Sequence, residues 1–172
     1  MNSILEYYQA IQNGSVIVGR WVRLWYGYIV RGLEEGRFTF DPKRANKAIK
    51  FIEHFCHHCE GRNDLLKLAL WQKALVLFGI LDQNGNRQFR EAVVIVSRKQ
   101  GKTLFAAAII AYMVYLDGEY GAKVYCIAPK LEQAAVVYDD FCQMVQSEPE
   151  LAQLSKKRRS DLYVSEWNAS VR

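Results

Sequence analysis

The chain has 172 residues, a formal net charge of +5 and a hydrophobic fraction of 51%. This composition excludes a disordered or low-complexity chain and is sufficient for one domain, or for one domain with a helical appendage. The positive charge permits a polyanionic partner but does not require one.

The N-terminus does not resemble a secretory signal, because the first ten residues include Glu6 and lack a basic start followed by an apolar core. No stretch is long and apolar enough to span a bilayer, and Leu104–Leu116 has only the length of a buried helix. We therefore expect no membrane association and a cytoplasmic location, where the four cysteines stay reduced.

The first third of the sequence predicts three helices. The first lies within residues 1–11 and ends at Asn13-Gly14, and the second runs from Ser15, a good N-cap residue, to Leu33. Its apolar residues repeat at helical spacing: Val18, Trp21, Val22, Trp25, Tyr28 and Ile29. The third begins at Asp41-Pro42 and continues to Gly61. The polar residues that follow place a domain boundary here, with a helical N-terminal arm over 1–62 and a second domain over 63–172.

The second domain begins with a short helix at about residues 70–78 and a turn-rich loop over 82–86. From Ala92 the pattern is strand, helix, strand, helix, with apolar strands at 92–96 and 123–128. Two such strands around a helix form a βαβ unit with a parallel sheet that is buried on both faces. The predicted fold class is therefore α/β, with an incomplete parallel sheet of the P-loop NTPase type after an α-helical arm.

The most informative segment is Val96-Ser97-Arg98-Lys99-Gln100-Gly101-Lys102-Thr103, which joins the first predicted strand to its helix. A phosphate-binding loop has this layout, because backbone N–H groups at a helix N-terminus surround the phosphate oxygens. Gly101 allows close approach of the backbone, Lys102 reaches the β- and γ-phosphates, and Thr103 offers its hydroxyl to Mg²⁺. Val96 replaces the usual first glycine, so an ordinary strand-to-helix turn with solvated lysines remains an alternative.

Arg98 and Lys99 add two cations inside this loop. Arg98 could contact the γ-phosphate and stabilise charge in the transition state. The alternatives are that it faces solvent or pairs with a nearby carboxylate.

Gln72 lies about thirty residues before the loop. A glutamine amide presents a donor and an acceptor side by side, which suits the edge of adenine. The alternative is a polar residue on an amphipathic helix.

Three other patterns have weaker functional interpretations. Cys56 and Cys59, with the nearby histidines, have the spacing of a zinc site, but the better interpretation is two buried cysteines beside exposed histidines. The basic run 156–159 is either solvated or a DNA contact. Asp139-Asp140 imitates the acidic second motif of an ATPase, but the flanking residues have helical periodicity, so we reject that interpretation.

Taken in order, several segments resemble the N-terminal part of the large terminase subunit of tailed bacteriophages, the ATP-driven DNA-packaging motor. They are YYQAIQNGSVIVGRWVRL, FDPKRANKAIKFIEHFCHHCEG, LWQKALVLFGI, VSRKQGKT and VYCIAPKLEQAAVVYDDF. The likeness covers almost the whole chain, and VSRKQGKT is similar to the family's phosphate loop, which also lacks the first glycine.

The resemblance implies ATP and Mg²⁺ as ligands, with Gln72 at adenine, Lys102 and Thr103 at the phosphates and metal, and Arg98 as the catalytic in-loop arginine. It implies as partners double-stranded DNA, a small terminase subunit, a portal protein and further copies in a ring, all in the bacterial cytoplasm. The family's acidic strand end and nuclease domain are not found in this sequence, so we expect no nuclease activity and doubt ATP hydrolysis by this chain alone. A non-catalytic assembly module and a helicase-like ATPase remain alternatives.

Overall fold

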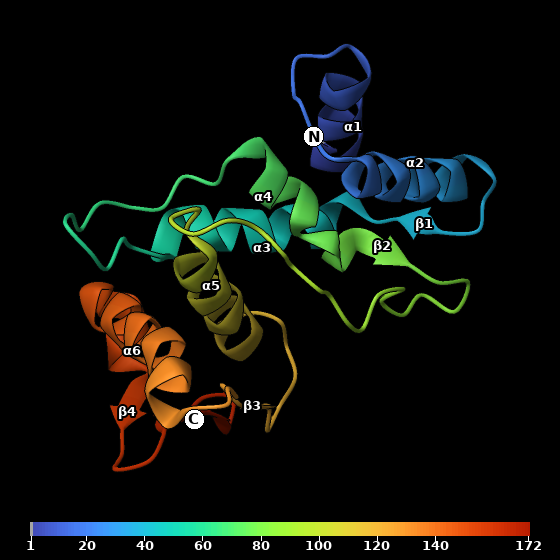
Figure 1. Cartoon of the computed structure of the whole chain (residues 1–172). Coiled ribbons are helices and arrows are strands. Elements are labelled where there is room, and N and C mark those ends of the chain that lie inside the picture. The colour runs from blue at the N-terminus through green and yellow to red at the C-terminus, as the bar shows by residue number, and fades with distance from the viewer. Residues whose placement is uncertain (1) are drawn as a thin grey trace. The chain divides into compact units, whose positions relative to one another are not determined.

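The computed structural model describes residues 2–172, which form two compact units (Figure 1). The first unit contains the residues up to Ile49 together with Leu68–Val94, and the second contains Lys50–Lys67 and Ile95–Arg172. Helix α3, Pro42–Phe55, passes from one unit into the other. The domain division proposed at residue 62 remains a prediction, and the two units are described separately below.

The first unit is mainly helical. It contains α1 (Ser3–Gln12), α2 (Arg20–Glu34), the start of α3 and α4 (Leu70–Leu75), followed by a 3-10 turn at Leu77–Gly79. Two short strands, β1 (Thr39–Phe40) and β2 (Ile80–Leu81), pair antiparallel, with Thr39 opposite Leu81. The predicted first and third helices are confirmed at their N-termini by side-chain caps. The Asn2 side chain accepts from the Ile4 amide at 3.2 Å, and Asp41 accepts from the Lys43 amide at 2.8 Å.

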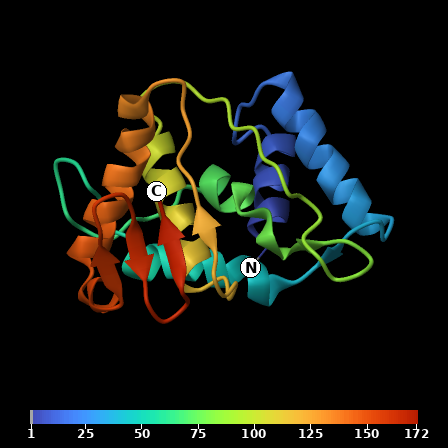
Figure 2. The same cartoon turned by 90° about the horizontal axis from the view of Figure 1, so that it is seen from below.

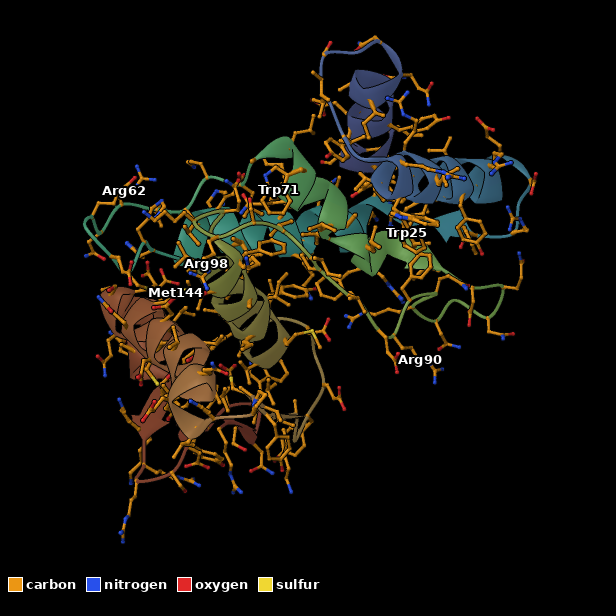
Figure 3. All side chains as sticks on the ribbon, viewed as in Figure 1. Trp25, Arg62, Trp71, Arg90, Arg98 and Met144 are labelled. Atoms are coloured by element: carbon orange, nitrogen blue, oxygen red, sulfur yellow. The ribbon has the colours of Figure 1, made fainter. Side chains whose placement is uncertain are left out.

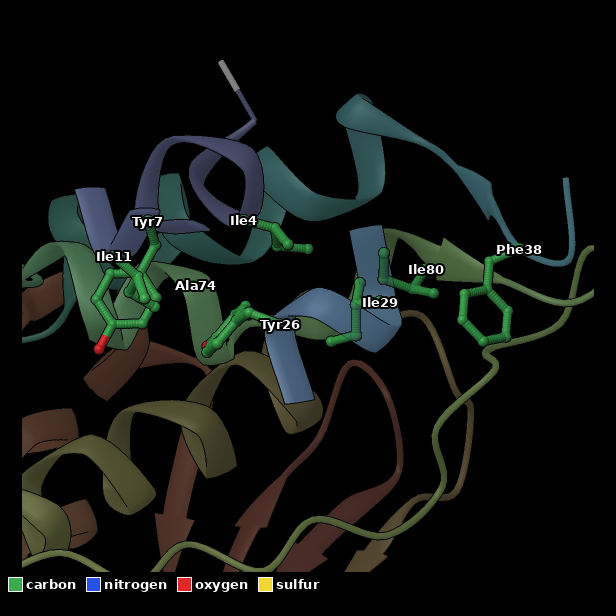
Figure 4. Close-up of a cluster of buried hydrophobic side chains, with 8 residues drawn as sticks. All are labelled: Ile4, Tyr7, Ile11, Tyr26, Ile29, Phe38, Ala74 and Ile80. Carbon is green, nitrogen blue, oxygen red and sulfur yellow. The ribbon is translucent and has the colours of Figure 1, made fainter. Parts of the chain in front are cut away.

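One apolar cluster holds the first unit together (Figure 4). Tyr7 of α1 and Tyr26 of α2 meet edge to face, with ring centroids 4.9 Å apart. This geometry adds to the burial of their area, so the two helices are held by aromatic contact as well as by exclusion of water. The buried members of the cluster are Ile4, Tyr7, Ile11, Tyr26, Ile29, Phe38, Ala74 and Ile80.

Two predicted helix limits in this part of the chain are wrong. Helix α2 begins at Arg20, not at Ser15. Gly14 has a positive φ of 78°, and the following residues Val16 and Val18 pack in non-helical backbone against the cluster, which delays the helix. Helix α3 ends at Phe55, not at Gly61, because the chain turns and the Leu66 amide donates to the Cys56 carbonyl at 2.8 Å.

The second unit combines helices with a four-stranded mixed sheet. Its helices are α5 (Lys102–Tyr115), α6 (Leu131–Ser147) and α7 (Pro149–Gln153), and its strands are β3 (Lys123–Val124), β4 (Ser155–Lys157), β5 (Leu162–Val164) and β6 (Ala169–Val171). The strand order is β3-β6-β5-β4, with β3 parallel to β6 and the remaining pairs antiparallel. Figure 2 shows these strands in front of α5 and α6. The mixed α/β class is thus confirmed.

The core of the second unit lies between the helices and the sheet. Small residues on α5 let the neighbouring helix approach closely, since alanine side chains leave room for larger ones opposite. Its fully buried residues include Ala107, Ala108, Ala111, Phe141, Met144, Leu162, Val164 and Val171. The strands β4, β5 and β6 were not anticipated, although Leu162 and Val164, and Ala169 and Val171, show the alternation of a half-buried sheet.

The predicted buried strand at Ala92–Val96 is wrong for this structure, in which residues 92–96 have no strand among the described residues 2–172. The side chains of Val93 and Ile95 are 87% and 89% exposed. No neighbouring strand in the described chain accepts hydrogen bonds here, and an apolar run becomes a strand only when a neighbour pairs with it. The predicted strand at 123–128 is likewise reduced to Lys123–Val124, which pairs in parallel with β6 and not with residues 92–96.

Among residues 2–172, no helix is both long enough and apolar enough to cross a lipid bilayer.

Candidate phosphate-binding loop

The loop Ser97–Gly101 leads directly into α5. Two of its residues have positive φ, Lys99 at 61° and Gly101 at 68°. Gly101 is the N-cap residue in left-handed conformation, a backbone geometry that glycine adopts without the steric cost of a Cβ. The Phe105 amide donates to the Gly101 carbonyl at 2.9 Å, which starts the helix. The predicted change from loop to helix at Gly101-Lys102 is therefore present.

Lys102 folds back over the loop. Its Nζ donates to the Val96 carbonyl at 2.7 Å and to the Ser97 carbonyl at 2.8 Å. These bonds join the two ends of the loop and hold the ammonium group beside the backbone that precedes α5. The lysine is exposed, so this closure occurs at the surface of the unit.

The N-terminus of α5 is electropositive. Within the described residues no side chain caps its first turn, and no acidic residue occupies that turn. Its first amides and the positive end of the helix dipole therefore face outward, beside the charges of Arg98, Lys99 and Lys102. Arg98 is exposed on the loop (Figure 3), as are Ser97 and Gln100. Such a combination of amides and cations suits an anion with several oxygen atoms.

Thr103, the proposed Mg²⁺ ligand, is the second residue of α5 and is half-buried. It therefore shares the helix terminus with Lys102. In P-loop ATPases Mg²⁺ is held by the nucleotide phosphates, a Ser or Thr hydroxyl and an acidic residue, and Thr103 is the candidate for the hydroxyl.

Gln72 lies in the first unit, on α4. Its Oε1 accepts a hydrogen bond from the Ala69 amide at 2.9 Å, so its carbonyl stabilises the start of its own helix. The carbonyl of the Gln72 side chain thus has a structural role on its helix, which agrees with the alternative interpretation. The proposed contact of Gln72 with adenine remains a prediction.

Cys56 and Cys59 lie in the interior of the second unit as free thiols. The Cys59 Sγ donates to the Asp140 carbonyl at 3.2 Å, and burial raises the pKa of the Cys59 thiol to about 11. Burial also raises the pKa of Cys56. The prediction that the two cysteines are buried is confirmed. The prediction that the histidines are exposed holds for His54 but not for His57 and His58, which are half-buried.

The basic run at 156–159 and the acidic pair at 139–140 have defined places in the second unit. The guanidinium of Arg158 lies 3.8 Å from the centroid of the Tyr163 ring and 3.9 Å from the buried Asp161 carboxylate. Arg158 therefore has a structural role in the hairpin. Asp139 and Asp140 lie on α6, as the rejection of an acidic strand end predicted.

The apolar repeat of α2 is not buried along a single face. Tyr26, Ile29 and Val30 are buried, whereas Trp21 and Trp25, with Tyr28, are exposed. The signal available in the sequence was the arginines at 20, 23 and 31, which lie among the aromatic residues and mark a solvent-facing side.

The family described as "Terminase large subunit, ATPase domain" matches residues 70–168, which include α4, the loop and α5. The chain belongs to this family of bacteriophage terminase large subunits, as the resemblance predicted. The match favours the packaging hypothesis over the helicase-like alternative.

A particular relative is the terminase large subunit of Enterobacteria phage HK97, which is 30% identical over 114 residues, covering 64% of this chain and 22% of that protein. The crystal structure of the HK97 bacteriophage large terminase matches with a TM-score of 0.65 and 25% identity, covering 75% of this chain and 26% of that one. The chain thus spans about a quarter of the length of these relatives.

Proposed function

We propose that this chain is the ATP-binding portion of a viral DNA-packaging motor. The observation that carries the proposal is the loop at the N-terminus of α5, where Gly101 in left-handed conformation lies between Arg98 and Lys99 on one side and Lys102 and the uncapped amides on the other. Family membership supplies the motor context. The phosphates bind the amides between Ser97 and Thr103, with Lys99 and Gln100 contributing backbone contacts.

In this proposal Lys102 exchanges partners when nucleotide binds. Its ammonium group now donates to the carbonyls of Val96 and Ser97, which are neutral acceptors. The β- and γ-phosphate oxygens carry negative charge, so the ammonium group is attracted to them by a charge–charge interaction that the neutral carbonyls do not offer. The interaction of the Lys102 ammonium group therefore becomes more favourable when it leaves the carbonyls, and the loop opens as the phosphates bind.

Arg98 and Thr103 complete the phosphate site. Arg98 is exposed and can reach an anion held by the loop, where its planar guanidinium suits γ-phosphate oxygens. Thr103 ligates Mg²⁺ through its hydroxyl. Gln72 binds adenine through its Nε2 group, since its Oε1 is engaged by Ala69.

In the full-length protein, ATP hydrolysis drives double-stranded DNA into the procapsid through a ring of subunits that contacts a small subunit and a portal, in the host cytoplasm. For the present 172 residues we propose binding without hydrolysis. The acids Asp139 and Asp140 lie on α6 and not at a strand end beside the loop, so neither is positioned to activate water. This supports the second candidate, a non-catalytic assembly module, for this chain alone.

Calorimetry with Mg-ATP tests the proposal. Lys102→Ala should weaken binding by about tenfold or more, because a hydrogen bond to a charged group contributes roughly 1.5–3 kcal/mol. Lys67→Ala is the matched control, since Lys67 is an exposed lysine of the same unit outside the loop. Equal affinity of the chain and its Lys102→Ala variant would rule the proposal out. Measurable ATP turnover by these residues would refute the non-catalytic candidate.

A further inference from the structure

The outer face of α2 carries large apolar side chains that stay partly or largely exposed. Trp21 is 77% exposed, Leu24 48%, Tyr28 38% and Trp25 37%. Their spacing of three, four and seven residues places all four on one side of the helix. Single exposed apolar residues are common, but a contiguous row of this kind marks an interaction surface. We call these four residues the α2 stripe.

The α2 stripe is held in a fixed arrangement by contacts within the first unit. Trp25 stacks on Tyr28 with centroids 6.0 Å apart, and it also meets Phe89 at 5.1 Å. Figure 3 shows Trp25 on α2. Side chains that are already ordered lose little conformational entropy when a partner binds. Tryptophan and tyrosine are also the residues that most often dominate binding energy at protein interfaces.

Arginines border the α2 stripe. The guanidinium of Arg20 lies 5.6 Å from the Trp21 ring, and that of Arg37 lies 5.0 Å from the Tyr28 ring. Arg23 and Arg31 are exposed on the same helix, and the sequence has no acidic residue between Glu6 and Glu34. Glu35, at the end of the helix, is paired with Arg37 at 2.8 Å and offsets its charge. The net positive charge of α2 therefore comes from Arg20, Arg23 and Arg31.

We propose that the α2 stripe is a docking surface for an acidic amphipathic helix of a partner protein, with apolar residues against the stripe and carboxylates against the arginines. A helix of this kind supplies apolar anchors at the spacing the stripe presents. Complementary charge then fixes the orientation and speeds association. The inference rests on the first unit alone and is independent of nucleotide binding.

Two other occupants fit less well. Duplex DNA offers phosphates to the arginines but little apolar surface to Leu24 or Trp21, and those side chains would stay in water. A second copy bound through the same face would bring two sets of arginines together, which is unfavourable. The first unit has ten lysines and arginines against six acids, so this repulsion extends beyond the helix.

The probe is a designed amphipathic peptide of about 20 residues, long enough to be helical, with leucines on one face and glutamates beside them. Fluorescence anisotropy measures its binding to the whole chain. A peptide with the same leucines and lysines in place of the glutamates is the charge control, and a short DNA duplex is the nucleic-acid control.

Binding of the glutamate peptide should fall about tenfold or more in Trp21→Ala and in Leu24→Ala, as for residues that anchor an interface. Leu5→Ala, at an exposed leucine of α1, is the matched control and should leave it unchanged. Arg20→Glu should weaken binding of the glutamate peptide and strengthen that of the lysine peptide. The four substituted residues, Leu5, Arg20, Trp21 and Leu24, are all exposed, so thermal melting should show that each variant is folded.

The proposal is overturned if the glutamate peptide does not bind, or binds the stripe variants as well as the original chain. It is equally overturned if the lysine peptide binds as tightly. Loss of DNA binding in Leu24→Ala, with peptide binding intact, would assign the stripe to DNA. Self-association of the chain that Leu24→Ala abolishes would assign it to a second copy.

Discussion

The ammonium group of Lys102 donates to the carbonyl of Val96 at 2.7 Å, across the loop that precedes α5. Val96 takes the place of the usual first glycine of the motif, so this hydrogen bond joins the one position that departs from the motif to the lysine of the motif. The contact uses only the backbone of Val96, which explains why a residue other than glycine can stand there. The loop is closed on itself and, in the proposed function, opens for phosphate.

Gly101→Ala should lower both stability and ATP affinity. The left-handed φ of 68° costs a residue with a Cβ about 1–2 kcal/mol. Chemical denaturation and calorimetry measure the two effects, and Gly101→Asn should be milder because asparagine tolerates this conformation. Gly14, with φ of 78°, lies in the arm. Gly14→Ala should cost similar stability and leave ATP affinity unchanged; an equal loss of affinity would contradict a specific role for Gly101.

Two glycines of α2 should respond oppositely to alanine. A Cβ on Gly32 would overlap the ring of Phe38, whereas one on Gly27 would make an ordinary contact with Tyr8 at 3.9 Å. Gly32→Ala should destabilise the chain by about 1–3 kcal/mol through overpacking. Gly27→Ala should be neutral or should stabilise by up to about 1 kcal/mol through helix propensity. Thermal unfolding decides this, and equal effects at the two sites would contradict the packing of α2 on Phe38.

Ile29 is fully buried in the apolar cluster of the first unit. Ile29→Ala should reduce the free energy of unfolding by about 2–5 kcal/mol, because it removes buried methyl groups and leaves a cavity. Ile17→Ala, at a residue that is 95% exposed, should change it by no more than about 0.5 kcal/mol. Urea denaturation of both variants tests whether Ile29, and not Ile17, belongs to the buried cluster. A larger effect of Ile17→Ala would refute this.

Asp82 should make stability depend on pH. The amide of Asn86 donates to its carboxylate at 2.9 Å and lowers the pKa of Asp82 below its ordinary 3.8, with the Asn84 amide contributing at 2.8 Å. A depressed folded-state pKa contributes stability that is present above the ordinary pKa and lost as pH falls through the folded value. Urea denaturation at about pH 5 and about pH 3 should therefore show a smaller loss for Asp82→Asn than for the original chain.

Glu91→Gln is the control for this experiment, since Glu91 is exposed and the substitution changes the charge of the chain equally. It should leave the pH dependence in place. If the chain and its Asp82→Asn variant lose the same free energy of unfolding between pH 5 and pH 3, the turn at 82–86 is not the cause of the pH dependence.

Local signals in the sequence determined the end of the first helix before Gly14, the helix start at Pro42, the helices after Gly101 and Pro129, and the loop with its cations. Caps, turn residues and helical repeats act over a few residues, so they can be read without knowing the fold. The placement of Asp139 and Asp140 on a helix followed from the same kind of repeat.

Only the tertiary structure decided which side of α2 is buried and which segments form strands. The repeat of α2 offers two apolar sides, and contacts with Tyr7 and Phe38 selected the one that contains Tyr26 and Ile29. Residues 92–96 and 123–128 were both predicted as apolar strands, yet of these only Lys123–Val124 pairs with another strand, β6, whose Ser170 lies opposite Lys123. Strand formation depends on such distant neighbours, and a sequence pattern alone cannot specify them.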